Sequence, residues 1–403
     1  MSGESQALQP FDRAPATPRA TSAAGAPRSR ARDLRLDFFR GCALIFIFLD
    51  HIPDNAVSYF TLRSFAFCDA AEVFIFISGY TAALVYARAF DREGIAMGTA
   101  RIYRRVWQLY VAHICLFMIF NAEVAYTMKF LNNPLFSDEL QVADYLDNPG
   151  EAFIRVLLLQ FQPSLLNILP LYIALLLILP LVLLAIRRNV LLALVPSAIL
   201  YLVVQVTDLN MPGFPEGHHW YFNPFAWQFL FVVAAVLGVV NASRPDALHW
   251  VRWLVAPAVA FAIVAAVLRM SWMVHEVFPS VPLYVHLPAS WFEKTDLRLP
   301  RLLSMLALVL VTARFIAPDA RFMTSRAGWI IVLIGQNSLY VFCLTILLSV
   351  AATFIISLTG GAVLPLLAVN VGGVLIMFAM GLLLAWFKEG GRLPPRPTRV
   401  VPA

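Results

Sequence analysis

The chain has 403 residues, of which 60% are hydrophobic and only 13% are charged, and its formal net charge is +6. Soluble domains carry about 25% charged residues, so this composition excludes an ordinary soluble globular protein and indicates a multi-span membrane protein. The positive charge does not indicate a nucleic-acid partner, because the basic residues lie in short loops between apolar segments, a pattern that determines membrane topology.

The chain divides into a long apolar region and two polar tails. Residues 1–32 are rich in Ala, Pro, Ser and Arg and are predicted to be a disordered cytoplasmic tail. They contain no apolar stretch typical of a signal peptide, so we expect the first span to be retained. Residues 33–387 are predicted to form one transmembrane domain, and residues 388–403 a second cytoplasmic tail.

Long apolar segments recur throughout the transmembrane region. A helix that crosses a membrane needs about 20 such residues, and the fold class predicted from these segments is all-α, a polytopic bundle of about ten transmembrane helices. Residues 152–163 are too short to cross and are expected to form an interfacial or re-entrant helix. The predicted spans are 36–53, 65–87, 104–127, 167–186, 189–206, 224–241, 252–270, 300–317, 329–356 and 363–387.

The loops between the predicted spans differ in charge. Most of the 30 basic residues flank the spans on the side of the N-terminus. Because cytoplasmic loops carry the excess of Lys and Arg, both termini are predicted to be cytoplasmic. The loops at 128–151, 207–223 and 271–299 then lie outside, where a substrate or partner would meet them.

The first span carries four ionisable residues, Asp37, Arg40, Asp50 and His51. Arg40 and His51 are eleven residues apart, so they share one face of a helix at a separation of about 16 Å along the axis. Asp37 precedes Arg40 by three residues and can pair with it. Ionisable groups inside a membrane indicate a pathway or a site, although Asp37 and Arg40 could also anchor the helix among lipid headgroups.

Two more carboxylates begin the second span. Asp69 and Glu72 are three residues apart on one helical face, at about the depth of His51. We therefore expect Asp50, Asp69 and Glu72 to meet His51. A carboxylate beside a histidine raises its basicity and fixes its tautomer, which suits general-base activation of an alcohol.

Ser78 and Gly79 lie deeper in the second span. Gly79 permits close approach of a helix or a ligand. Ser78 is a weaker candidate nucleophile, because serine in a membrane helix usually hydrogen-bonds its own backbone. In the following loop, Arg101, Arg104 and Arg105 form a cationic group. The topology rule explains this group, and so does a phosphate clamp.

No metal site is predicted. The four cysteines lie in apolar segments without a CxxC pair, and His218 and His219 have no third ligand at a telling spacing.

The stretches RLDFFRG…DHIP, CDAAEVFIFISGY, RRVWQLYVAHICLF and GQNSLYVFC together resemble the OpgC family. That family is named for the protein that succinylates osmoregulated periplasmic glucans, and it is similar to the wider acyltransferase-3 group. The resemblance covers residues 33–386. It implies an acyltransferase-3-like bundle of about ten spans that moves acyl groups from cytoplasmic donors to extracytoplasmic sugars.

Individual motifs of the wider group match this sequence. Its Arg-x10-His pattern matches Arg40 and His51, and its Arg-x-x-Arg loop motif matches Arg101 and Arg104. The resemblance implies that His51 is catalytic and that Arg40 and the loop arginines handle acyl-CoA. The phenylalanine-rich motif that ends in Ser-Gly-aromatic is matched by Phe74, Phe76, Ser78, Gly79 and Tyr80.

The predicted function is that of a membrane O-acyltransferase of the bacterial inner membrane. An acyl group, succinyl by resemblance, would move from acyl-CoA, a co-substrate and not a bound cofactor, to a periplasmic glucan or another glycan. Whether His51 is a general base or is itself acylated stays open, as does the carboxylate that orients it. The candidate catalytic residues are His51, Asp50, Asp69 and Glu72, and the candidate acyl-CoA-binding residues are Arg40, Asp37, Ser78, Gly79, Arg101, Arg104 and Arg105.

The expected partners are acyl-CoA, the glycan acceptor, membrane lipid and proteins of glucan synthesis. No extracytoplasmic domain follows the last predicted span, so we expect the outer loops or another protein to hold the acceptor. The alternative is a proton-coupled transporter, in which buried Asp, Glu, His and Arg form relays. A third hypothesis is a membrane scaffold for a glucan-synthesis enzyme.

Overall fold

The computed structural model describes residues 33–131, 142–244, 251–281 and 284–394. The predicted disordered tail, residues 1–32, lies outside the described residues, as does the last part of the C-terminal tail. The described residues form helices joined by turns and loops. The α-helices are α1 (Leu34–Asp50), α2 (Ala70–Glu93), α3 (Ile95–Leu131), α5 (Ala143–Asp147), α6 (Pro149–Leu157), α7 (Ile168–Arg188), α8 (Val190–Thr207), α9 (Pro224–Ser243), α10 (Val255–Val277), α11 (Leu299–Phe315), α12 (Arg321–Thr324), α13 (Arg326–Gln336), α14 (Ser338–Thr359) and α15 (Val363–Lys388).

In the described part of the chain, eight helices are long and apolar enough to cross a membrane. The predicted all-α polytopic fold is therefore confirmed, and the predicted number of ten spans is approximate. α1 and α11 have 17 residues each and fall just below that length. The eight are α2, α3, α7, α8, α9, α10, α14 and α15.

One predicted span is two helices in the structure. The apolar segment 329–356 breaks at Asn337, between α13 and α14. The Asn337 side chain donates to the carbonyl oxygen of Leu333 at 2.9 Å and accepts from Lys388 Nζ at 2.6 Å. A side-chain amide that binds the backbone competes with the helical pattern, which hydropathy alone does not reveal. Of the short helix predicted at 152–163, residues 152–157 lie in α6 and residues 158–163 are not helical.

Local signals explain where the central helices start. Asp33 caps α1 by accepting from the backbone N–H of Arg35 at 3.1 Å. α2 begins with a capping box, in which Asp69 accepts from the N–H of Ala71 and Glu72 accepts from the N–H of Asp69. The Asp33 cap lies at the start of α1, and the Asp69 cap lies where the connection from α1 enters α2. That connection contains the 3₁₀ helices η1 (Ala56–Phe60) and η2 (Leu62–Ser64).

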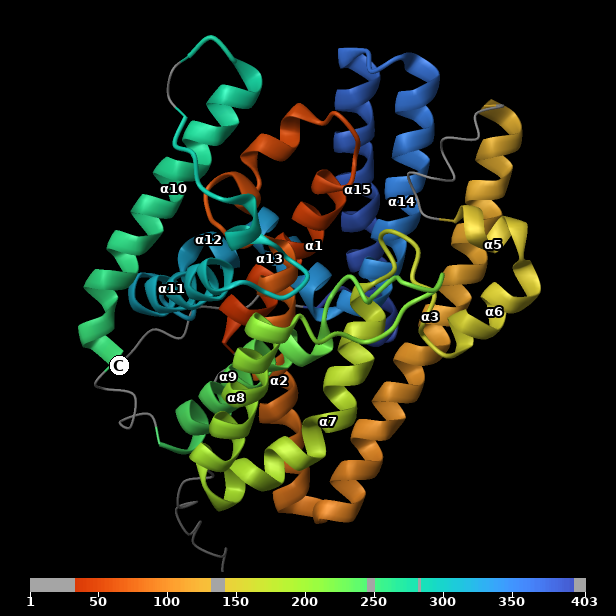
Figure 1. Cartoon of the computed structure of the whole chain (residues 1–403). Helices are drawn as coiled ribbons and strands as arrows, with labels where there is room; N and C mark the ends of the chain where they lie inside the picture. Colours follow the sequence, from red (N-terminus) through yellow and green to blue (C-terminus); the bar gives the residue numbers. More distant parts are fainter. Residues whose placement is uncertain (1–32, 132–141, 245–250, 282–283, 395–403) are drawn as a thin grey trace, which may run out of the picture. The chain divides into compact units, whose positions relative to one another are not determined.

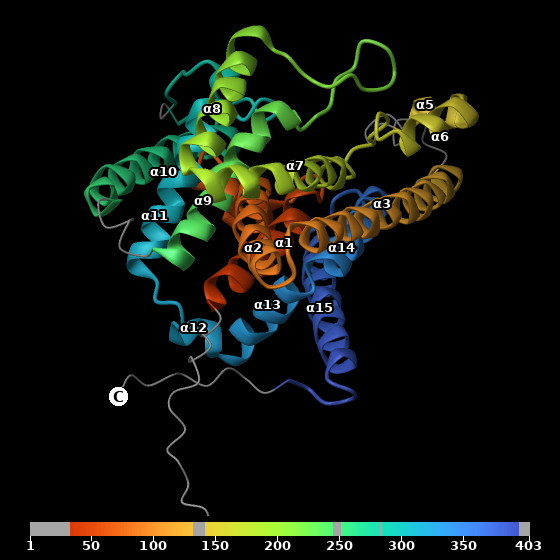
Figure 2. The ribbon, with the colours of Figure 1, turned by 90° about the horizontal axis from the view of Figure 1, so that it is seen from below.

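α1 and α2 lie at the centre of the described bundle. α10 and α11 lie on one side of them, and α3, α14 and α15 lie on the other (Figures 1 and 2). We call the side at which α1 begins the near side, which is the predicted cytoplasmic side. The side at which α1 ends is the far side.

Glycines bring α2 and α9 into close contact. A Cβ atom on Gly79 would lie 2.7 Å from the carbonyl oxygen of Phe231, and one on Gly238 would lie 2.7 Å from that of Tyr80. Each helix therefore has a glycine against the backbone of the other, and small residues at such contacts are typical of membrane helix pairs. The role of Gly79 in the described structure is this packing contact.

Candidate active site

His51 directly follows α1 on the far side, and its side chain is exposed. Ring atom Nδ1 lies 2.5 Å from the carbonyl oxygen of Ile47. Because a carbonyl oxygen can only accept, Nδ1 carries the proton, and Nε2 of the neutral ring is left as the basic nitrogen. The imidazole is thus held in the tautomer that presents a base away from its own helix.

A carboxylate was expected to bind the His51 ring, but in the structure the carbonyl oxygen of Ile47 binds it instead. Within the described residues, Asp50, Asp69 and Glu72 make no hydrogen bond to the ring. Asp50 instead accepts from the hydroxyl of Thr61 at 2.6 Å, and Arg63 Nε lies 3.7 Å from it. The expectation that one of the three carboxylates orients His51 by direct contact is therefore corrected.

Asp69 and Glu72 belong to a buried group of charges with two cations that sequence analysis did not select. Arg301, at the start of α11, donates from Nε to Glu72 Oε1 at 2.7 Å and from a terminal nitrogen to Asp69 Oδ2 at 3.0 Å. Lys294 Nζ lies 2.7 Å from the same Asp69 oxygen. This far-side ion cluster, Asp69, Glu72, Lys294 and Arg301, joins α2 to α11 and to the loop before it.

Lys294 remains positively charged in this environment. Burial alone would lower the pKa of Lys294, but the carboxylates of Asp69 and Glu72 offset that effect, so the pKa is raised above its ordinary value. The charges of Lys294, Asp69 and Arg63 also act on the nearby His51 ring. The far-side ion cluster therefore influences His51 electrostatically without contacting it.

The polar residues near the other end of α1 contact neighbouring helices. Arg40 donates to the hydroxyl of Thr81 at 2.6 Å and to the carbonyl oxygen of Ile77 at 3.3 Å, both on α2. Asp37 is buried and accepts from Gln336 of α13 at 3.4 Å. Ser78 is also buried.

The three arginines of the predicted phosphate clamp lie on α3. Arg101 pairs with Glu93 at 2.9 Å, and Arg105 donates to Gln108 at 3.3 Å. Arg104 is exposed. Neither these three arginines nor Arg40 lines the two cavities described next.

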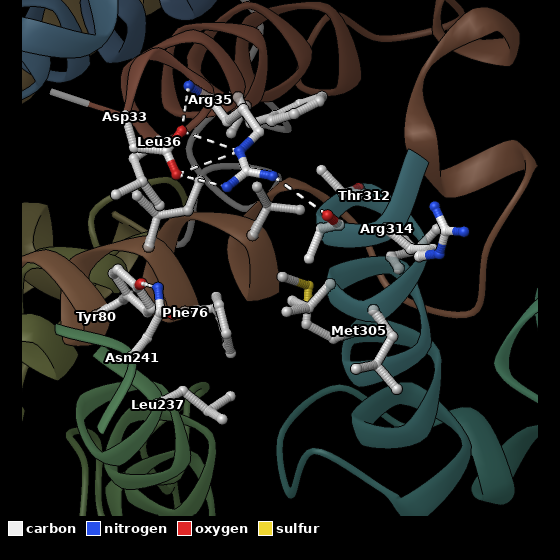
Figure 3. Close-up of a pocket in the computed structure, with 18 of the residues that line it drawn as sticks. Asp33, Arg35, Leu36, Phe76, Tyr80, Leu237, Asn241, Met305, Thr312 and Arg314 are labelled. Atoms are coloured by element: carbon white, nitrogen blue, oxygen red, sulfur yellow. Dashed lines mark hydrogen bonds and ion pairs between the residues drawn. The ribbon is translucent and has the colours of Figure 1, made fainter. Parts of the chain in front are cut away.

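A cavity of about 670 Å³, here called the near cavity, lies between α1, α2, α9 and α11 (Figure 3). Leu36, Phe39, Ala43 and Phe46 line it from one face of α1, as their spacing of three or four residues requires. Leu36 and Phe46 are ten residues apart, which corresponds to about 15 Å along the helix axis. The near cavity is therefore a long, apolar space that runs along α1.

Polar groups gather at the near-side end of this cavity. Arg35 is bound to Asp33 at 2.7 Å and donates to the carbonyl oxygen of Ile316 at 2.9 Å. Figure 3 shows this pair, and it also shows Asn241 donating to the hydroxyl of Tyr80 at 2.8 Å. Arg252 and Arg314 complete the cationic lining. Among the described residues that line the near cavity, Arg35, Arg252 and Arg314 are the cations, and the α3 arginines do not line it.

A second cavity of about 230 Å³, the far cavity, lies on the far side. It is formed by η2, the start of α2, the end of α10 and the start of α11. Its walls combine aromatic rings, including Trp272 and Phe292, with charged side chains. The charged residues are Arg63, Asp69, Arg269, Glu276 and Arg301.

The two cavities follow one another along three elements. On α2, Asp69 lines the far cavity and Val73 the near cavity. On α11, Arg301 lines the far cavity and Met305 lines the near cavity. On η2, Arg63 lines the far cavity and Leu62 lines the near cavity. Residues four apart in a helix are separated by about one turn, or about 6 Å. The near cavity therefore ends about one helical turn from the far cavity.

The family profile described as "OpgC protein" matches residues 32–389. The chain belongs to the OpgC family. Membership in the OpgC family indicates a membrane acyltransferase-like role in glucan modification. Neither the curated proteins nor the solved structures contain a significant match to the chain.

Proposed function

We propose that this OpgC-family chain is a membrane O-acyltransferase that uses acyl-CoA as its donor. The acyl group, succinyl by family likeness, passes to a hydroxyl of a periplasmic glucan or another glycan. In this proposal the protein lies in the bacterial inner membrane with both termini cytoplasmic. The observation that supports it is the succession of an apolar cavity and a charged cavity along α2, α11 and η2, with the exposed His51 ring on the same side as the charged cavity.

The donor would enter from the near side. The pantetheine arm of coenzyme A is long and narrow, which suits a cavity that runs about 15 Å along α1. The phosphates of the nucleotide cannot follow into an apolar space and would stay at the opening, where Arg252 and Arg314 can bind them. The α3 arginines do not line the near cavity. In this proposal Arg101, Arg104 and Arg105 therefore serve as an outer cationic surface.

The reaction would occur on the far side. Nε2 of His51 takes the proton of an acceptor hydroxyl, and the oxygen attacks the thioester carbonyl. The C–S bond breaks, and the coenzyme A sulfur leaves as a thiol after receiving that proton from the imidazolium. The Nδ1–H bond to Ile47 keeps the ring oriented through both steps.

The acceptor would approach the loops of the far side. The segments 208–223 and 284–298 contact each other there, because the N–H of Asn223 donates to the carbonyl oxygen of Thr295 at 3.0 Å. We propose that these loops hold the glycan together with proteins of glucan synthesis.

Transfer of a radiolabelled acyl group tests the proposal. Membrane vesicles that contain the protein are supplied with labelled succinyl-CoA on the cytoplasmic side and with glucan on the other. We expect label in the glucan, and we expect His51→Ala to abolish it while expression and detergent-extracted size stay unchanged. Arg155→Gln, which changes a partly exposed arginine of α6 that pairs with Glu151, is the control and should retain transfer.

Other outcomes decide between the alternatives. Unmodified solute that crosses the membrane with protons, without labelled glucan, would support the transporter. Full transfer by His51→Ala would contradict the role of His51. Mass spectrometry of protein quenched after donor addition distinguishes the two routes at His51, because only covalent catalysis leaves an acyl group on its ring.

A further inference from the structure

The apolar helix α10 contains one charged residue of interest, Arg269. It lies eight residues before Val277, the last residue of the helix. At 1.5 Å per residue this is about 12 Å from the end of the helix. A charged side chain at such a depth is costly unless it is paired or faces a polar space. Arg269 faces the far cavity.

The contacts of Arg269 hold the guanidinium in place but do not neutralise it. Its Nε donates to the carbonyl oxygen of Arg63 at 2.7 Å, and its guanidinium carbon lies 5.5 Å from the centre of the Trp272 ring. Among the described residues, no carboxylate lies within ion-pair distance of it. Both terminal nitrogens remain available for a bidentate partner.

The other charges around the far cavity already have partners. Arg301 is neutralised by Asp69 and Glu72, and Lys294 shares Asp69 with it. Arg63 lies 3.7 Å from Asp50. Glu276 accepts from the hydroxyl of Tyr59 at 3.3 Å. Among the cations that line the far cavity, Arg269 is therefore the one that no carboxylate of the described residues contacts.

We propose that the far cavity is a carboxylate-binding subsite in which Arg269 is the principal ligand. A volume of about 230 Å³ accommodates a group of several heavy atoms but not a coenzyme or a glucan. Trp272 supports the guanidinium from one side and leaves its edge for the carboxylate. The carboxylate belongs either to the acyl group that is transferred or to an acidic substituent of the acceptor, and this last assignment rests on the proposed function.

Direct binding tests the subsite without any reaction. The probes are succinate and its neutral diamide, and the readout is thermal unfolding of the full-length protein in detergent over a concentration series. Succinate should stabilise the wild type and the diamide should not. Arg269→Gln should weaken succinate binding by about tenfold to a hundredfold, because that is the loss of affinity expected when a charge-assisted hydrogen bond is removed. Arg269→Lys should recover part of the affinity.

Two control variants make this result specific. Arg155→Gln changes a partly exposed arginine of α6 that pairs with Glu151, and it should bind succinate as the wild type does. His51→Ala should also keep succinate binding. If Arg269→Gln fails to fold, Glu276→Gln replaces it, because removal of a negative charge from the same cavity should tighten succinate binding several-fold. Equal binding of both probes, or no effect of either variant, would overturn the subsite.

Transfer assays identify the source of the carboxylate. If it belongs to the acyl group, Arg269→Gln loses the preference for succinyl-CoA over butyryl-CoA, which ends in a methyl group. If it belongs to the acceptor, the same variant instead loses the preference for acidic over neutral glucan. If both preferences persist, the assignment to the substrates is wrong. A wild type that transfers nothing contradicts the proposed function alone, since Arg269-dependent succinate binding would still stand.

Discussion

At the scale of single residues, the charges of the far side have divided roles. The Ile47 carbonyl orients His51, which leaves Asp69 and Glu72 to bind Arg301 and Lys294. Glu72 is completely buried and Arg301 is 9% exposed. Because little water reaches them, each charge is stabilised mainly by its ion pair with the other. The far-side ion cluster is therefore an organising element of the site.

Removal of Arg301 should destabilise the protein strongly. Arg301→Met leaves two carboxylates without their shared cation in a buried position, and we expect the free energy of unfolding to fall by about 3–5 kcal/mol. Denaturant unfolding of the protein in mixed micelles measures this. Arg155→Gln on α6 is the control and should change the free energy by less than about 0.5 kcal/mol. A small effect of Arg301→Met would mean that the carboxylates are protonated or hydrated.

At the scale of helices, the contact between α2 and α9 depends on two glycines. Gly79→Leu would force a side chain against the carbonyl oxygen of Phe231, where a Cβ atom alone would lie at 2.7 Å. Overpacking of this kind costs about 1–3 kcal/mol, so we expect a lower thermal unfolding temperature and reduced expression.

The matched control lies on α15. Gly372 is also within a helix, but a Cβ atom there would meet nothing within 4 Å. Gly372→Ala should leave the unfolding temperature unchanged or raise it slightly, because alanine has the higher helix propensity. If Gly79→Leu behaved in the same way, the close contact between α2 and α9 would be wrong.

Sequence analysis predicted the helices well where hydrophobicity decides them. The all-α fold follows from the length and recurrence of apolar segments. The second span was predicted to begin at residue 65, whereas α2 begins at Ala70 behind the Asp69–Glu72 capping box. The break at Asn337 was missed because one amide that binds Leu333 and Lys388 acts through tertiary contacts. Asp69 and Glu72 were expected at the depth of His51, and the charge of Asp69 acts on the His51 ring.

The partners of those carboxylates could not be predicted from spacing. Arg301 and Lys294 are more than 200 residues away in sequence from Asp69 and Glu72. A signal was nevertheless present. Arg269, Lys294 and Arg301 are basic residues on the predicted outer side, where the topology rule disfavours them. All three lie in or beside the far cavity, so exceptions to a charge rule can reveal a site.

At the scale of the whole bundle, about one helical turn of α2 and α11 separates the near cavity from the far cavity, and we call this segment the narrow place. Met305 lines the near cavity and lies one helical turn from Arg301 on α11. Its exposed fraction is only 4%. Met305→Trp should obstruct an acyl chain at this point, and we expect the turnover of acyl transfer to fall at least about tenfold because small displacements of a reacting group are costly.

Comparison with a neighbouring helix separates obstruction from general damage. Val264 of α10 is 54% exposed, so Val264→Trp adds the same side chain outside the path and should retain wild-type turnover. Steady-state transfer at saturating donor measures both variants. Unchanged turnover of a folded Met305→Trp protein would show that the acyl group takes another route.

The narrow place also bears on how a cell could tolerate such a protein. Leu62, Val73 and Met305 surround it with hydrocarbon from three separate elements. A hydrated ion would have to shed its water there, which is costly. An apolar lining of this kind would limit the leakage of hydrated ions across the bilayer during the proposed acyl transfer.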